Sequence, residues 1–265
     1  MFTDRKFLQG KQYFEAGNLN ARIALHNRFS ANPYGWFRWV FDHLESPGNS
    51  RLLELGCGPA DLWGENSDRV PEGWQIYLSD FSAGMLQQAR RRLLPSRANF
   101  RYAVIDAQAI PFQEAAFDAV IANHMLYHVP DMQHAFAEVR RTLKLEGRFF
   151  AATNGADHMH EIKELVHRVD PQAAYSGMDL AFRLETGSEL LRPYFSSVTV
   201  DRYEDALNVT EVEPLVGYIL SMITLRGIRM EGGRLESFYR LLEQEISRQG
   251  AIHITKSTCL FICQP

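Results

Sequence analysis

The sequence is poor in cysteine, with three among 265 residues, at positions 57, 259 and 263. An odd and scattered set of this kind is not a disulfide framework, and no pair of CxxC units is present to hold zinc. The sequence also lacks the basic excess typical of proteins that neutralise nucleic-acid phosphates, because 28 Lys and Arg stand against 32 Asp and Glu. We therefore expect neither a disulfide-rich fold nor a nucleic-acid partner.

No apolar run approaches the ~18 residues that a membrane span requires, and the first residues carry no apolar signal region. We expect a cytoplasmic protein without a membrane partner. Internal repeats and low-complexity segments are absent as well. With 46% apolar residues, the chain is long enough to bury the core of one large α/β domain.

Strands and helices alternate through the middle of the chain. Apolar runs predict strands, and apolar residues at helical spacing predict helices. The predicted strands are 51–55, 76–78, 100–105, 117–122, 147–153, 197–203 and 252–263, and the predicted helices are 18–29, 36–44, 82–94, 132–143, 156–169, 211–222 and 234–248. This alternation is typical of a parallel sheet with helices on both faces.

The two ends of this pattern suggest additional helical parts. We expect residues 1–45 to form a helical extension or lid, and residues 46–265 to form the main domain with a helical insertion at about 205–250. The helices on either side of the main pattern are candidates for a cap over an active site. The alternative, that they only cover the edges of the sheet, is nearly as well supported.

The most informative segment, Leu52–Pro59, reads LLELGCGP. An apolar strand here runs into a glycine-x-glycine turn, and glycine lets a backbone approach a ligand closely. The dinucleotide fingerprint G-x-G-x-x-G is not present, since Asp61 occupies the third glycine position, and no G-K-[ST] of a phosphate loop follows. Glu54 before the turn would repel a pyrophosphate and suits a ligand with a cationic or hydroxyl-rich end.

Acidic residues also end the next two predicted strands. Asp80 follows Gly58 by 22 positions, and Asp106 ends the third strand. A carboxylate at the second strand can accept hydrogen bonds from both hydroxyls of a ribose, and one at the third can accept from an exocyclic amine. Together with Glu54, these side chains describe a nucleoside without phosphates, bound at the carboxyl ends of the strands.

Residues 50–153 resemble the class I S-adenosylmethionine-dependent methyltransferases, and most of all the small-molecule group that includes the ubiquinone and menaquinone C-methyltransferases. The resemblance is carried by four stretches: 52–59, 78–82, 104–112 and 117–131. It implies a Rossmann-like sheet of seven mostly parallel strands with an antiparallel last strand, and S-adenosylmethionine as cofactor without a metal. Pro59, where threonine is common, is a small departure from the family pattern.

The resemblance also implies roles for individual residues. It places Glu54, Gly56, Cys57 and Gly58 around the methionine moiety. Asp80 would hold the ribose hydroxyls beside Phe81, Asp106 and Ala107 would contact the adenine, and Asn123 would lie under the sulfonium through its backbone.

Polar residues after the fourth strand are the candidates for catalysis. His124, Tyr127 and His128 would face the transferred methyl group as a base or as an acceptor-orienting group, although His128 has a local packing role as an alternative. Tyr13, His158 and Tyr218 are candidate substrate contacts. A metal site at His158 and His160 is not expected, because positions two apart lie on different faces of a helix.

These residues predict a methyltransferase of a small organic acceptor, with oxygen or nitrogen as the favoured target. Methylation of a carbon on a quinone-like or prenyl-like acceptor is an alternative, and so is methylation of RNA or protein. A non-enzymatic S-adenosylmethionine-binding scaffold or sensor ranks last. A homodimer is an open option, since cap helices with apolar faces could pair.

Overall fold

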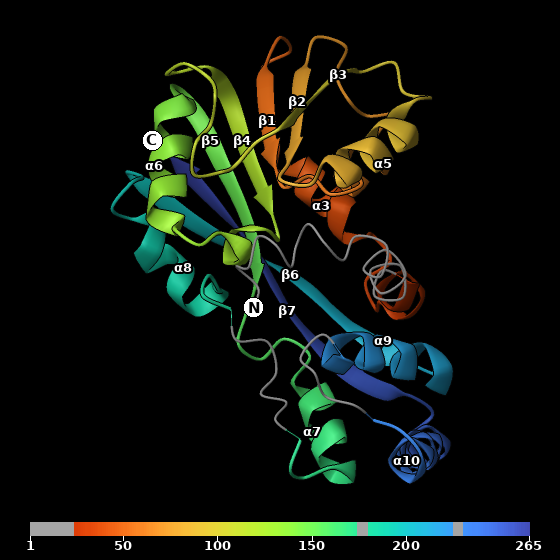
Figure 1. The fold of residues 1–265 in the computed structure, drawn as a ribbon. Helices are drawn as coiled ribbons and strands as arrows, with labels where there is room; N and C mark the ends of the chain where they lie inside the picture. Colours follow the sequence, from red (N-terminus) through yellow and green to blue (C-terminus); the bar gives the residue numbers. More distant parts are fainter. Residues whose placement is uncertain (1–23, 174–179, 225–229) are drawn as a thin grey trace.

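The computed structural model describes residues 24–173, 180–224 and 230–265, which build a seven-stranded sheet with helices on both faces (Figure 1). The strand order is β3-β2-β1-β4-β5-β7-β6, and β7 alone runs antiparallel to its neighbours. This arrangement confirms the predicted Rossmann-like class. The strands are β1 Arg51–Leu55, β2 Gln75–Asp80, β3 Asn99–Val104, β4 Phe117–Asn123, β5 Leu143–Asn154, β6 Ser197–Val209 and β7 Ile252–Gln264.

Side chains alternate across the sheet and divide the core into two layers. Leu52, Ile76 and Ala119 pack with helices α3 (Trp36–Asp42), α4 (Asp61–Gly64) and α5 (Ala83–Leu93) on one face. Leu53, Tyr77 and Val120 pack with α6 (Met132–Thr142) and α8 (Leu184–Leu191) on the other. Because both faces are covered, the central strands read as nearly continuous apolar runs.

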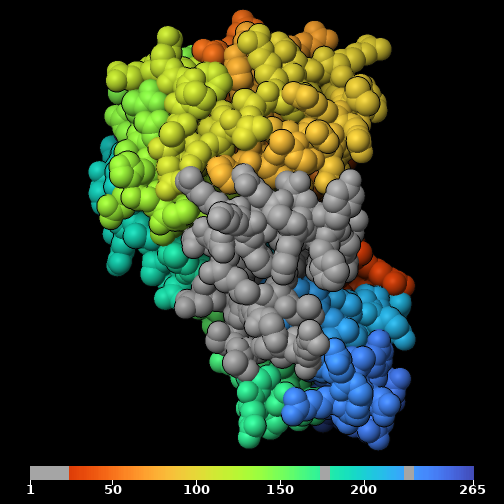
Figure 2. All heavy atoms as spheres, viewed as in Figure 1, coloured from red at the N-terminus to blue at the C-terminus, as the bar shows by residue number. Residues whose placement is uncertain are grey.

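A third core lies beyond the end of β5. Strands β6 and β7 continue as a two-stranded ribbon, pairing from Glu204↔Ser257 to Val209↔Ile252. Helices α7 (His160–Val169), α9 (Val212–Thr224) and α10 (Gly233–Gln249) pack against this ribbon. Figure 2 shows α9 and α10 as a blue group of atoms at the far end of the molecule from β1–β3. The late helices therefore have a core of their own.

The structure corrects several predicted boundaries. The helix expected from Ala156 begins at His160, because residues 155–159 are tied to β7, with the Met159 N–H donating to the Thr255 carbonyl at 2.9 Å. The strand expected to end at Tyr203 reaches Val209, and the helix expected from residue 211 begins at Val212. The elements α4, α8 and η1 (Leu126–His128) were not predicted, because they are too short to show a helical spacing of apolar residues. Of the expected helix 18–29, the described residues 24–29 are helical.

The turn after β1 depends on its two glycines. Gly56 and Gly58 have φ values of +64° and +54°, in the left-handed region. A side chain at Gly56 would meet Cβ of Met125 at 2.7 Å, whereas one at Gly58 would meet nothing within 4 Å. Gly56 is therefore required twice over, by its backbone angle and by the closeness of Met125.

We predict that Gly56→Ala destabilises the protein more than Gly58→Ala does. Gly58→Ala adds backbone strain of about 1–3 kcal/mol, and Gly56→Ala adds the collision with Met125 to a strain of the same order. Urea denaturation of the two variants measures the difference in the free energy of unfolding. Equal losses would show that Met125 gives way without cost.

Candidate functional site

A cavity of about 430 Å³ opens at the carboxyl ends of β1, β2, β3 and β4. The order in which the chain adds strands reverses here: β2 and β3 lie on one side of β1, and β4 and β5 lie on its other side. Ligands of open parallel sheets bind at such a switch point. All nine predicted cofactor residues line the cavity: Glu54, Gly56, Cys57, Gly58, Asp80, Phe81, Asp106, Ala107 and Asn123.

Glu54 lies in the floor of the cavity and is only 2% exposed. Its Oε2 accepts a hydrogen bond from Nε1 of Trp63 at 2.6 Å. The pKa of this carboxyl is raised to about 8, chiefly by burial; the hydrogen bond from Trp63 opposes the rise, and the carboxylates of Asp61 and Asp80 contribute to it. The side chain is therefore largely protonated at neutral pH, and a cation beside it would favour its ionised form.

Asp80 joins the glycine turn to the start of α5. Its Oδ2 accepts from the N–H of Gly58 at 2.9 Å, and its Oδ1 accepts from the N–H of Ser82 at 2.8 Å. Burial raises the pKa of Asp80, and these two N–H groups oppose the rise. A carboxylate has about four lone-pair sites, so both oxygens keep capacity for a ligand hydroxyl.

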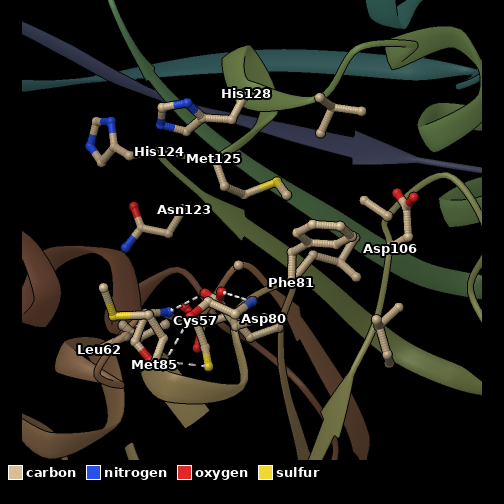
Figure 3. Close-up of a pocket in the computed structure, with 18 of the residues that line it drawn as sticks. Cys57, Leu62, Asp80, Phe81, Met85, Asp106, Asn123, His124, Met125 and His128 are labelled. Carbon is tan, nitrogen blue, oxygen red and sulfur yellow. Dashed lines mark hydrogen bonds between the residues drawn. The ribbon is translucent and has the colours of Figure 1, made fainter. Parts of the chain in front are cut away.

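Asp106 follows β3, with its carboxyl group held by a local turn. Its Oδ1 accepts from the backbone N–H of Gln108 at 3.0 Å and from Nε2 of the same residue at 2.8 Å. Figure 3 shows Phe81 between Asp80 and Asp106 on the cavity wall. Two carboxyl groups with an aromatic ring between them suit a flat heterocycle joined to a diol.

Asn123 and His124 form the wall beyond β4. Oδ1 of Asn123 accepts a hydrogen bond from Nε1 of Trp36 at 3.2 Å, which ties α3 to this wall. His124 has φ +54°, an uncommon value for a residue with a side chain and one that concentrates at functional sites. Its ring lies 5.1 Å from that of Trp36. Burial and the charge of Lys256 lower the pKa of His124 to about 4, so the imidazole is neutral at pH 7.

The remaining catalytic candidates differ in position. His128, at the end of η1, lines the cavity, and Figure 3 places its ring on the same side as His124. Tyr127 is not among the described lining residues and packs against the core beneath α6. Its ring lies 4.6 Å from that of His128.

His158 and Tyr218, the two predicted substrate contacts within the described residues, are not among those that line this cavity. Tyr218 is buried in the third core, with its hydroxyl donating to the sulfur of Met159 at 3.0 Å and its ring 5.9 Å from that of His26. His158 is held beside β7, where its Nδ1 accepts from the N–H of Ser257 at 3.2 Å. Tyr13 lies outside the described residues.

Sequence reasoning missed the apolar part of the lining. Phe37, Leu62, Met85 and Met125 contact the cavity from α3, α4, α5 and the turn after β4. Isolated apolar residues of this kind have no motif that separates them from core positions. A signal existed only for Met125, which directly follows His124 in the segment already expected to face the ligand.

Within residues 24–173, 180–224 and 230–265, no group of three His, Cys, Asp or Glu side chains is arranged to hold a metal ion. In the same part of the chain, no helix combines the length and the apolar character that a membrane crossing demands.

Comparison with known proteins gives a family for the central part of the chain. Residues 53–151 match the family model described as a methyltransferase domain. This range contains the cavity floor, all three carboxylates and both histidines of the opposite wall.

Two groups of curated relatives match a longer segment. The ubiquinone/menaquinone biosynthesis C-methyltransferase of Desulfotalea psychrophila is 28% identical over 166 residues, which cover 63% of this chain and 65% of the relative. The malonyl-[acyl-carrier protein] O-methyltransferase of Geobacter sulfurreducens is 31% identical over 155 residues, which cover 57% of each chain. The chain thus spans less than two thirds of the length of either relative.

Solved structures extend the likeness to the whole chain. The phosphoethanolamine N-methyltransferase 2 of Haemonchus contortus, in complex with S-adenosyl-L-methionine, matches with a TM-score of 0.57 at 21% identity. The match covers 100% of this chain and 60% of the neighbour. At this identity the likeness establishes the shared fold.

The buried Glu54 leads to a prediction about stability and pH. Its pKa is about 8 in the folded protein, against an ordinary value of about 4.3. Between these values the folded state binds more protons than the unfolded state, so the contribution of Glu54 to stability falls as the pH rises. Glu54→Gln keeps an acceptor for Trp63 and removes this loss.

We therefore expect the free energy of unfolding of Glu54→Gln, measured relative to the parent, to be higher at pH 8.5 than at pH 5. The expected change in this difference is at least about 2 kcal/mol. Urea denaturation at both pH values gives the two differences. A gap between variant and parent that stays constant with pH would mean that Glu54 is ionised in the folded protein.

Proposed function

We propose that the chain is a class I methyltransferase that transfers a methyl group from S-adenosylmethionine to a small organic acceptor; the match of residues 53–151 to a methyltransferase domain supports this proposal. The observation that carries the proposal is the register of Glu54, Asp80 and Asp106 along one cavity at the switch point of the sheet. A cavity of about 430 Å³ falls within the ~300–1,000 Å³ of small-molecule sites.

The residues present fit S-adenosylmethionine. Open space beside Gly58 leaves room for a ligand against the turn, and Asp80 keeps acceptor capacity beyond its two backbone partners. Asp80 would hold the ribose hydroxyls, Asp106 and the Ala107 backbone would contact the adenine, and Glu54 would face the ammonium end. When bound, this cofactor supplies a methyl group on a positively charged sulfur.

The chain's own contribution to the reaction is orientation and exclusion of water. His124 would meet the acceptor, but with a pKa of about 4 it is a weak base and has no proton to give at neutral pH. An acceptor that is already nucleophilic needs no stronger base. Holding it in line with the methyl group can lower the barrier by roughly 7–11 kcal/mol.

Methylation of carbon is a second candidate. It is favoured by the match to a ubiquinone/menaquinone biosynthesis C-methyltransferase. An electron-rich quinol carbon is a nucleophile that the apolar lining residues Phe37, Met85 and Met125 could enclose. A cytoplasmic location and a homodimer stay predictions.

The proposal is tested by calorimetry with S-adenosylhomocysteine, the product of the transfer. We predict that the parent chain binds it, and that Asp80→Asn weakens binding by tenfold or more, since a charged hydrogen bond is worth about 1.5–3 kcal/mol. The folded parent failing to bind either S-adenosylhomocysteine or S-adenosylmethionine would refute the proposed function.

The matched control is Asp118→Asn. Asp118 also bonds a backbone N–H next to a strand, that of Arg51 at 2.9 Å, and pairs with Lys144, but it lies at the opposite end of β4 from the cavity. Its substitution should leave the affinity for S-adenosylhomocysteine unchanged. Urea denaturation of both variants separates loss of binding from loss of folding.

A further inference from the structure

Four nitrogen-bearing side chains lie close enough to interact electrostatically, and one of them, His124, lines the cavity while the other three lie behind it; we call them the histidine–lysine cluster. His26 comes from the helical residues 24–29, His124 follows β4, His158 precedes α7, and Lys256 lies in β7. Segments more than two hundred residues apart in the sequence thus bring their polar groups to one place. The proposed cofactor contacts account for none of these four side chains.

Ring contacts connect the cluster to the cavity. The ring of Trp36 lies 5.1 Å from that of His124 and 5.5 Å from that of Tyr203. The ammonium group of Lys256 lies 5.8 Å from the centre of the Tyr203 ring. His124 itself lines the cavity, so the cluster begins where the acceptor must approach.

The charge of Lys256 is fixed by Asp205, which faces it across the β6–β7 ribbon. Oδ2 of Asp205 accepts from Lys256 and from Oγ of Ser30, and Oδ1 accepts from the N–H of Asn32 at 2.9 Å and of Ala206 at 2.8 Å. The carboxylate is thus fully occupied. Among the described residues, Asp205 is the one hydrogen-bond acceptor of Lys256, whose ammonium group has three donors.

The histidines offer donors that the protein does not use. Nδ1 of His158 accepts from Ser257, so the proton of the neutral ring is on Nε2 and points to no acceptor in the described part of the chain. Nδ1 of His26 is buried and has no hydrogen-bond partner within the part of the chain that the structure describes. Buried polar atoms are paired in the great majority of cases, so this atom is a position where a group supplied from outside could bind.

The charges around the cluster favour a negatively charged ligand. Burial is the largest cause that lowers the pKa of His26, His124 and His158, and the charge of Lys256 contributes to the lowering at each of them. At His26 the carboxylate of Asp205 opposes the lowering, and at His158 the neighbouring imidazoles add to it. A cation brought into these surroundings would be repelled by Lys256 and could not accept from the imidazole N–H groups. An anion would be attracted and would accept from them.

We infer that the histidine–lysine cluster is the acceptor subsite for an ionised oxygen acid, a carboxylate or a phenolate. This inference rests on the proposed function, because it assigns the acceptor of the same site. It separates oxyanion acceptors from amines, which would enter the cavity as ammonium ions at neutral pH.

The test uses three probes of one shape and different charge: benzoate, benzamide and benzylamine. Each is titrated into the full chain, with and without saturating S-adenosylhomocysteine, while NMR follows the imidazole signals of the histidines. We expect benzoate to shift the signals of His26, His124 and His158 and to bind at least about tenfold more tightly than benzamide. Benzylamine should shift none of them.

Matched variants assign the effect to the cluster. His158→Gln should weaken benzoate binding, whereas His160→Gln, two positions along and on the exposed side of α7, should not. His124→Asn should also weaken it, and asparagine tolerates the left-handed backbone at this position. Equal affinities of the two glutamine variants would overturn the assignment.

The outcomes distinguish the two proposals. If S-adenosylhomocysteine binds but benzoate shifts none of the three imidazole signals, or benzylamine binds as well as benzoate, the acceptor subsite is wrong and the proposed function stands. If S-adenosylhomocysteine does not bind while benzoate does, the cluster binds oxyanions and the proposed function fails.

Discussion

The site depends first on one carboxylate, that of Asp80. By accepting from the N–H groups of Gly58 and Ser82, it fixes the turn after β1 to the first turn of α5. Because Gly56 in this turn has no side chain, Met125 can approach it closely from the end of β4. The ends of β1, β2 and β4 are therefore held in register by backbone hydrogen bonds and a steric contact, and the cavity between them has a defined shape before any ligand enters.

The cavity is electrostatically divided. Asp80 and Asp106 carry carboxyl groups on one wall, above the protonated Glu54 in the floor, whereas His124 on the other wall lies within the electrostatic influence of Lys256. In the proposed reaction, the cationic cofactor would be stabilised on the side of the carboxyl groups, and the anionic acceptor that we infer would be stabilised on the other side. Two reactants of opposite charge would thus meet between the walls with little desolvation left to overcome, which is the situation that electrostatic preorganisation requires.

Much of the fold and of the cofactor wall could be predicted from the sequence, because both rest on local patterns. The strand ending in a glycine turn at Leu52–Pro59, and the serine cap of α5 at Ser82, are short-range features that survive folding unchanged. On the acceptor side, His124 and His158 were candidates from the sequence, but His26 and Lys256 were not. Ser30 and Asn32 attach the segment that carries His26 to Asp205 of β6, and Asp205 pairs with Lys256 across the ribbon, so this proximity depends on long-range contacts. Tyr218 illustrates the same limit: its place in a helix was expected, but the burial of its hydroxyl against Met159 depends on the third core.

The acceptor wall and the cofactor wall are held by different parts of the fold. The ribbon of β6 and β7 carries Lys256 and Asp205 near the point where it leaves β5. Beyond that point, its partners among the described residues include α7, α9, α10 and the helical residues 24–29. Substitutions in those helices can shift His26 and His158 without altering the turn held by Asp80. The acceptor wall can therefore vary while the cofactor wall stays constant, which is how one fold serves many substrates.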